Sequence, residues 1–224
     1  MGAAVGDVLG LAAGVAVSPL PIVAVILMLA TPRGRANGSL FVAGWMAGLA
    51  VLGTIVLLLA GPADASSGGE PAAWTGWLEL ALGVLALLLA AQQWRNRPAG
   101  GVPPEMPRWM AGLDRLEPVG AFGLGALLSA VNPKNGALTI AAAASIAGTG
   151  LPGVQQAATL AVFVVVGSLG VLAPLAVHLV AGERAARILD DWKTWASVHN
   201  AAVLGVLFLV FGVKLVGDGI GVLL

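Results

Sequence analysis

Long apolar stretches separated by short polar segments fill almost the whole chain. Six of them reach about 20 residues, the length at which an α-helix crosses a bilayer. They cover residues 5–30, 38–60, 74–94, 119–146, 154–180 and 198–223. The pattern predicts an all-α, polytopic membrane protein with six transmembrane helices.

The composition agrees with this prediction and narrows the chemistry. Of the 224 residues, 58% are hydrophobic and only 10% are charged, which leaves too little polar surface to cover a soluble particle. Residues 1–20 contain no Lys or Arg and their apolar run continues beyond them, so we interpret them as part of a membrane span and not as a signal peptide. The absence of cysteine excludes disulfides and thiolate sites.

The basic residues are distributed unevenly among the connecting segments. Nine of the eleven follow the first, third or fifth apolar stretch: Arg33, Arg35, Arg95, Arg97, Arg108, Arg115, Arg184, Arg187 and Lys193. The opposite side holds acidic residues: Asp7, Asp64, Glu70 and Asp218. Because cytoplasmic loops retain Lys and Arg, we expect a multi-pass protein of a bacterial plasma membrane with both termini outside.

The two halves of the chain resemble each other in pattern. Residues 1–94 and 118–224 each contain three apolar stretches, and a cytoplasmic linker at 95–117 joins them. Prolines interrupt the first stretch of each half, at Ser18-Pro19-Leu20-Pro21 and at Asn132-Pro133-Lys134-Asn135. With three spans per half, the second copy enters from the opposite face. We therefore expect two inverted three-helix repeats in which helices 1 and 4 are broken.

These two interruptions form the candidate site. A proline leaves the carbonyl four residues earlier without its helical donor, so Val15, Val17 and Ser129 should offer free oxygens at membrane depth. A charge in hydrocarbon costs about 3 kcal/mol or more, which favours a functional role for Lys134 as a cation or a proton carrier. The predicted site for an anionic or amphipathic substrate comprises Ser18, Pro19, Pro21, Ser129, Asn132, Pro133, Lys134 and Asn135. The alternative is that the prolines only kink helices for packing.

Several other features of the sequence have both a structural and a functional interpretation. Glu79, Lys214 and Asp218 provide either a structural ion pair with a snorkelling lysine or a proton relay. Two cytoplasmic connections carry apolar stripes that predict interfacial helices, which would anchor the chain, gate the site or recruit a partner. The stripes are Trp109, Leu113 and Leu116, and Ile188, Trp192 and Trp195. Gly44 and Gly48 predict close helix packing and leave a homodimer open.

The apolar stretches carry no metal-ligand cluster and no nucleophile beside a base. We therefore expect no enzymatic activity and no catalytic residue, metal or cofactor. The expected partners are membrane lipids and the substrate, without nucleic acid.

Several motifs together resemble one known family. The sequences at 18–21, 31–38 (TPRGRANG) and 132–135, with six spans in two halves, look like the glycolipid-addressing (GAP) family. That family includes the peptidoglycolipid-addressing and sulfolipid-addressing proteins and belongs to the lysine-exporter (LysE) superfamily. By this resemblance, the motif positions of a transport centre are held by Pro19, Pro21, Asn132, Pro133 and Lys134. Leu20 stands where amino-acid exporters of the superfamily have glycine, which favours the glycolipid branch.

The resemblance implies a transporter that exports, or helps to translocate, a cell-envelope glycolipid or related amphiphile by alternating access. Two alternatives stay open. A small-solute exporter of amino acids or ions would share the fold but have a narrow, enclosed pocket. A non-transporting accessory protein would instead hold a lipid-synthesis enzyme at the membrane.

Overall fold

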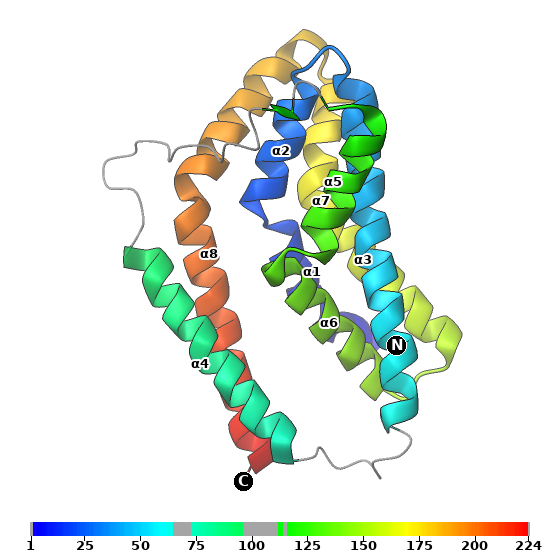
Figure 1. The fold of residues 1–224 in the computed structure, drawn as a ribbon, viewed down its shortest axis with the longest axis vertical. Coiled ribbons are helices and arrows are strands. Elements are labelled where there is room, and N and C mark those ends of the chain that lie inside the picture. Colours follow the sequence, from blue (N-terminus) through cyan, green and yellow to red (C-terminus); the bar gives the residue numbers. More distant parts are fainter. Residues whose placement is uncertain (1, 65–72, 96–111, 114–115, 224) are drawn as a thin grey trace. The chain divides into compact units, whose positions relative to one another are not determined.

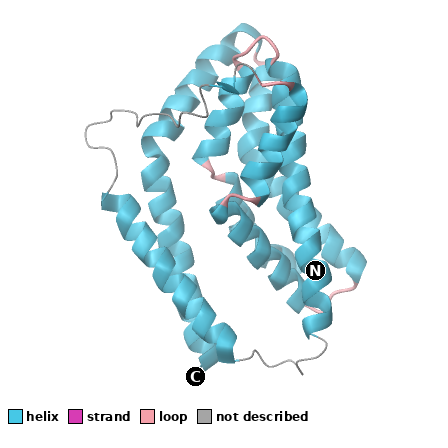
Figure 2. Cartoon of the chain, viewed as in Figure 1, coloured by secondary structure: helices cyan, strands magenta, loops and turns pink. Residues whose placement is uncertain are grey.

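The computed structural model describes residues 2–64, 73–95, 112–113 and 116–223, and in these residues all regular structure is helical (Figure 2). This confirms the predicted all-α class. In chain order the helices are α1 (Gly2–Ala16), α2 (Pro19–Leu29), α3 (Gly34–Asp64), α4 (Ala73–Arg95), α5 (Pro118–Ala130), α6 (Pro133–Gly148), α7 (Gly153–Val180), the short η2 (Gly182–Arg184) and α8 (Ala185–Leu223).

Both proline-interrupted stretches are split into two helices, as predicted. Pro19 and Pro133 each occupy the first turn of a new helix, where the missing N–H costs nothing. The axes of α1 and α2 differ by 54°. The four apolar stretches without such prolines at their centres lie in the continuous helices α3, α4, α7 and α8.

Among the residues that the structure describes, three helical segments are long and apolar enough to cross a membrane: Gly34–Leu59, Gly153–Val180 and Ala201–Gly221. The bent pair α1–α2 makes a fourth if it is counted as one span. Large apolar side chains such as Leu58, Leu59 and Val180 lie exposed on these helices. Length and exposed apolar surface together are typical of a membrane protein.

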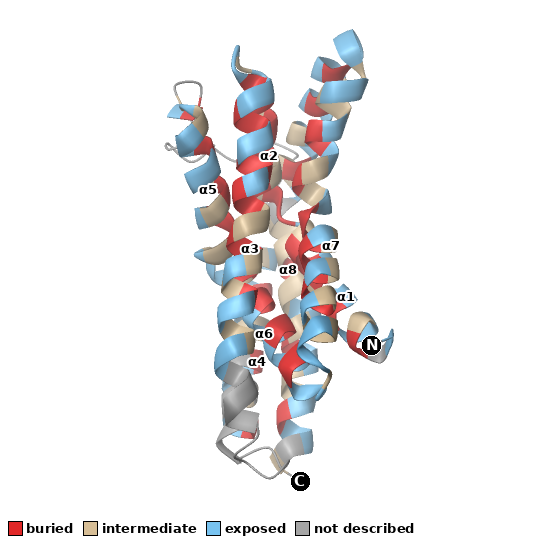
Figure 3. Ribbon diagram, turned by 90° about the vertical axis from the view of Figure 1, so that its right-hand side faces the viewer, coloured by how far each residue is buried: buried red, intermediate tan, exposed pale blue. Residues whose placement is uncertain are grey.

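The chain divides into two compact units. The first contains residues 1–62 and 105–196, and the second contains residues 63–104 and 197–224, so each draws on both halves of the sequence. In the first unit, buried residues alternate with exposed ones along the helices (Figure 3). Phe41 and Trp45 of α3 stack with ring centroids 6.5 Å apart, and both are buried together with Phe163 of α7.

Glycines allow α3 and α5 to approach each other closely. A Cβ at Gly44 would lie 2.0 Å from the Phe122 carbonyl oxygen, and one at Gly48 would lie 2.1 Å from Ser129 Oγ. From the other helix, a Cβ at Gly125 would lie 2.1 Å from the Phe41 carbonyl oxygen. The predicted packing role of Gly44 and Gly48 is therefore confirmed. Because this face is used within the chain, the two glycines no longer argue for a homodimer.

The connection before the last apolar stretch differs from the prediction. The stripe of Ile188, Trp192 and Trp195 does not form a separate interfacial helix, because α8 runs unbroken for 39 residues, or about 58 Å. Gly182, with φ of 54°, turns the chain between α7 and α8, and the next glycine is Gly205.

The other predicted stripe is only partly described. Trp109 lies outside the described residues, whereas Leu113 is buried in the first unit and does not form an exposed stripe. The carbonyl of Leu116 accepts a hydrogen bond from Asn37 Nδ2 at 2.9 Å, which ties the segment before α5 to the start of α3.

The second unit pairs α4 with the last part of α8 through glycines on both helices. A Cβ at Gly219 would lie 2.7 Å from the Gly76 carbonyl oxygen, and one at Gly83 would lie 3.0 Å from the Gly212 carbonyl oxygen. The glycines are seven residues apart on each helix (76 to 83 and 212 to 219). A seven-residue spacing keeps small residues on one face, so the two antiparallel helices are in contact over several turns.

Candidate functional site

The two helix breaks lie beside each other in the first unit. One consists of Val17 and Ser18, between α1 and α2, and the other of Val131 and Asn132, between α5 and α6. Within this unit, α1 and α6 extend toward one end from the breaks, whereas α2 and α5 extend toward the other (Figure 1). The links are separated by more than 110 positions in the sequence and meet through side chains.

Local sequence determines where each helix restarts. Asn132 is the N-cap of α6, and its Oδ1 accepts a hydrogen bond from the Lys134 backbone N–H at 3.1 Å. Such caps satisfy one of the free N–H groups of a first helical turn. Ser18 occupies the same position before α2, but its hydroxyl makes no cap bond. Its hydroxyl is therefore available to the other break.

Lys134 joins the two breaks. Its Nζ donates to the Val17 carbonyl oxygen at 3.0 Å and to Ser18 Oγ at 2.8 Å. The first acceptor is the carbonyl oxygen that Pro21 leaves without a helical donor. The cation and the free carbonyl predicted from sequence therefore satisfy each other across the chain.

Asn135 makes the second connection between the breaks. It is fully buried, and its Nδ2 donates to the Leu128 carbonyl oxygen at 3.1 Å in the last turn of α5. This bond turns Oδ1 toward Ser18, whose Oγ lies 2.9 Å away. Asn135 therefore holds α5, α6 and the α1–α2 link in one arrangement.

The Ser18 hydroxyl has more acceptors than protons. Its oxygen lies 2.7 Å from the Val15 carbonyl oxygen, which Pro19 leaves without a donor, and 2.9 Å from Asn135 Oδ1. A hydroxyl carries one proton, so it can donate to only one of them at a time. The single hydroxyl proton of Ser18 is therefore shared between the Val15 carbonyl oxygen and Asn135 Oδ1.

The remaining predicted residues differ in exposure and partners. Pro19 and Pro21 are buried, Asn132 and Lys134 are half-buried, and Pro133 is exposed. Ser129 is fully buried, but its hydroxyl bonds to the Ala126 carbonyl oxygen at 3.0 Å and faces Gly48 of α3. The structure therefore places Ser129 in the α3–α5 contact and not with Lys134.

Two apolar residues of the breaks are exposed. Val17 is 42% exposed and Val131 is 67% exposed, so apolar side chains border the half-buried Lys134. By contrast, Ser18, Asn135 and Thr139 are buried, and Thr139 Oγ1 donates to the Asn135 carbonyl oxygen at 2.8 Å. The exposed Val17 and Val131 therefore form an apolar edge at the centre, while Ser18, Asn135 and Thr139 are packed within the chain.

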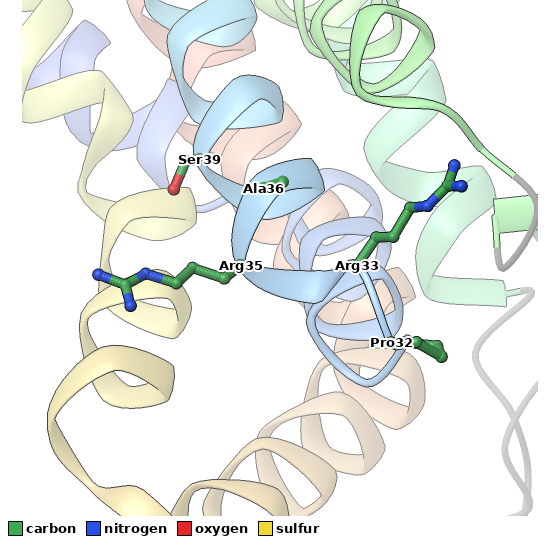
Figure 4. A pocket seen from close by; sticks show the side chains of 5 residues that line it. All are labelled: Pro32, Arg33, Arg35, Ala36 and Ser39. Atoms are coloured by element: carbon green, nitrogen blue, oxygen red, sulfur yellow. The ribbon is translucent and has the colours of Figure 1, made fainter.

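Two surface pockets lie away from the breaks. One is a depression at the start of α3, where the side chains of Arg33 and Arg35 extend in opposite directions (Figure 4). The other, of about 360 Å³, lies between α2, α7, η2 and α8. Neither is lined by Ser18, Lys134 or Asn135.

Comparison with known proteins assigns the family. Residues 8–221 match the family described as "Sap, sulfolipid-1-addressing protein". The match covers nearly the whole chain, including both breaks. The chain belongs to this family. No curated protein and no solved structure matches it.

This membership confirms the resemblance to the sulfolipid-addressing proteins that the sequence motifs indicated. It agrees with the apolar helices, and together they identify a membrane protein of a family concerned with sulfolipid addressing.

The other ionisable candidates lie in the second unit. Lys214 and Asp218 form an ion pair on α8, with side chains 64% and 44% exposed. The side chain of Glu79, on α4, lies outside the described residues.

Sequence reasoning assigned no role to four other buried polar residues: Asn37, Thr139, Thr159 and Ser168. Thr139 lies one turn after Asn135 on α6, and Asn37 lies near the start of α3. Thr139 is an isolated polar residue in an apolar run, and that placement was a signal available in the sequence, whereas Asn37 lies among Arg33, Arg35 and Ser39 and does not stand out.

Proposed function

We propose that the chain is a membrane transporter that exports, or helps to translocate, a cell-envelope glycolipid or related amphiphile. The proposal rests chiefly on the contact between the two helix breaks, in which Lys134 of one break binds Val17 and Ser18 of the other. Polar groups at membrane depth are costly, and broken helices there are typical of substrate sites in transporters.

The pattern of helix contacts supports two inverted repeats of three spans. The repeats would match α1–α2 with α5–α6, α3 with α7, and α4 with the last part of α8. Glycines of α3 contact α5, and correspondingly a Cβ at Gly170 of α7 would lie 1.9 Å from the Ala16 carbonyl oxygen of α1. The matched helices also contact each other in two cases. The breaks of α1–α2 and α5–α6 are in contact, and α4 contacts the last part of α8 through glycines.

In the proposed mechanism an anionic group of the substrate replaces the Val17 carbonyl oxygen on Lys134. Exchange of one acceptor for another avoids leaving an unpaired cation at membrane depth. Once this contact is released, the angle between α1 and α2 can change. The site can then open alternately to the two sides of the membrane. Asn132 and Asn135 orient the substrate while the prolines shape the helix ends.

The exposed apolar edge supports an amphiphile over a small solute. A channel or carrier for small polar solutes needs polar walls, whereas Val17 and Val131 offer apolar contacts beside Lys134. An acyl chain could remain against this edge while the headgroup engages the lysine. This is the feature that separates the proposal from a small-solute exporter of the same fold.

We also propose the orientation expected from the basic residues, with both termini outside a bacterial plasma membrane. Arg33 and Arg35 follow α2, and Arg184 and Arg187 follow α7. The ends of α2 and α7 meet the start of α8 at one pocket, so these four basic residues belong to the same end of the first unit. Such a concentration of Arg favours the cytoplasmic side.

Untargeted lipid profiling of the envelope tests the function directly. Cells lacking the protein should lose one surface glycolipid, which should return when the wild-type gene is restored. Unchanged envelope lipids together with altered tolerance to an amino acid would contradict the proposal and favour a small-solute exporter. If the lipid itself is no longer made, a role in supporting its synthesis is favoured instead of transport.

A further inference from the structure

The pocket between α2, α7, η2 and α8 has an apolar floor. Ile26 and Leu29 from the end of α2 and Leu189 from the start of α8 line it, and each is no more than 5% exposed. A pocket of about 360 Å³ with such walls lies within the range of small-molecule sites, roughly 300–1,000 Å³. The floor suits a short length of hydrocarbon.

The rim of the same pocket is polar and of mixed charge. It is formed by His178, Glu183, Asp190 and Lys193, and Lys193 is paired with Asp190. Among the described residues, Glu183 on the rim has no ion-pair partner, and its carboxylate would oppose an anion. Carboxylates accept hydrogen bonds, and the ammonium and imidazole groups donate them. Several hydroxyl groups on one ligand would satisfy this mixture better than a single charge would.

We propose that this pocket binds the sugar headgroup and first methylenes of a glycolipid-like amphiphile, with the hydroxyls at the rim and the hydrocarbon on the floor. The inference rests on the proposed function and adds a second binding site to it. The two sites differ in chemistry, since Lys134 offers a cation for an anionic group whereas the pocket offers a polyol site.

Helix α2 links the two sites. Ser18 immediately precedes its first residue, and Ile26, Leu27, Leu29 and Ala30 line the pocket at its other end. Eleven helical residues span about 16 Å. The pocket therefore lies at the far end of α2 from the central break. In this proposal the amphiphile binds in the pocket first and reaches Lys134 afterwards.

The sequence contains no cysteine, so a maleimide labels only a thiol that is introduced by substitution. Ala186→Cys places one thiol at the pocket, and Thr194→Cys places one on an exposed part of α8 outside it. Each full-length variant in lipid nanodiscs is labelled with a maleimide in the presence of octyl glucoside below its micellar concentration. At twice the Kd, labelling at position 186 should slow about threefold, since the free fraction is 1/(1 + [L]/Kd), while labelling at 194 is unchanged.

Further arms identify what is bound. Glucose alone and octyl sulfate should protect position 186 less than octyl glucoside does. In the Ala186→Cys background, Glu183→Gln should reduce the protection, whereas the matched change Asp191→Asn, outside the pocket, should preserve it. Equal slowing at 186 and 194, no slowing at 186, or stronger protection by octyl sulfate would each overturn the inference.

The same assay separates this inference from the proposed function. Lys134→Met should retain octyl glucoside protection at position 186 even where export of the glycolipid is lost. If octyl glucoside does not protect position 186 in an Ala186→Cys chain that exports normally, the pocket is refuted and the transporter proposal stands. Protection in a chain whose removal changes no envelope lipid would refute the transporter proposal and retain the binding site.

Discussion

Individual polar side chains hold the two helix breaks together. Asn135 bonds to α5 through Nδ2 and faces Ser18 through Oδ1, while Lys134 reaches across to Val17. The sequence predicted the polar types and the freed carbonyls, because prolines and a buried lysine are local features. It could not show that these groups satisfy one another, because that depends on two segments 117 positions apart meeting in space.

Replacement of Asn135 should therefore destabilise the protein more than replacement of a neighbour that bonds only within its own helix. Asn135→Ala removes the donor to Leu128 and should cost about 2 kcal/mol, since a buried carbonyl loses its partner. Thr139→Val removes one bond within α6 and should cost less than about 1 kcal/mol. Reversible unfolding in detergent measures both.

Equal costs for the two variants would show that Asn135 does not connect the breaks. Both residues are fully buried, so a difference in exposure would not explain unequal results.

The helices show why some boundaries could be predicted and others could not. Pro19 and Pro133 predicted two interruptions that the structure contains. The charged segment at 183–193 resembles a loop in composition, but it contains no proline or glycine, and Asp190 and Lys193 pair one turn apart on α8. Residues that are compatible with a helix therefore extend α8 through a segment that was expected to be a separate element.

Close approach of α3 and α5 gives a prediction at the scale of the element. Gly125→Ala would bring a Cβ to 2.1 Å from the Phe41 carbonyl oxygen, so the helices must separate at a cost of about 1–3 kcal/mol. Gly123→Ala on the same helix meets nothing within 4 Å and should be neutral or stabilising by up to about 1 kcal/mol. Unfolding midpoints of the two variants would distinguish them.

If Gly125→Ala is as stable as Gly123→Ala, the close packing of α3 on α5 is wrong. The glycine spacing at Gly44 and Gly48 predicted this type of contact, but the sequence did not indicate which helix would provide the partner surface.

At the scale of the whole molecule, the account depends on the contact between the two helix breaks and on the proposal that they belong to two inverted repeats. The repeat was predicted from matched apolar stretches and prolines, and the breaks do meet. The seven-residue spacing of Gly76 and Gly83 and of Gly212 and Gly219 was also readable in the sequence. Its meaning required knowledge that α4 and α8 run antiparallel in contact, which a single sequence does not supply.

The most direct measurement is the export rate of the glycolipid that the envelope profile identifies, compared between the wild type and Lys134→Met at equal amounts in the membrane. Arg187→Met, which removes a charge outside the proposed sites, is the control. Loss of a charge-assisted hydrogen bond worth about 1.5–3 kcal/mol should slow export by at least about tenfold in Lys134→Met and leave Arg187→Met unchanged. Wild-type export by Lys134→Met would contradict the account.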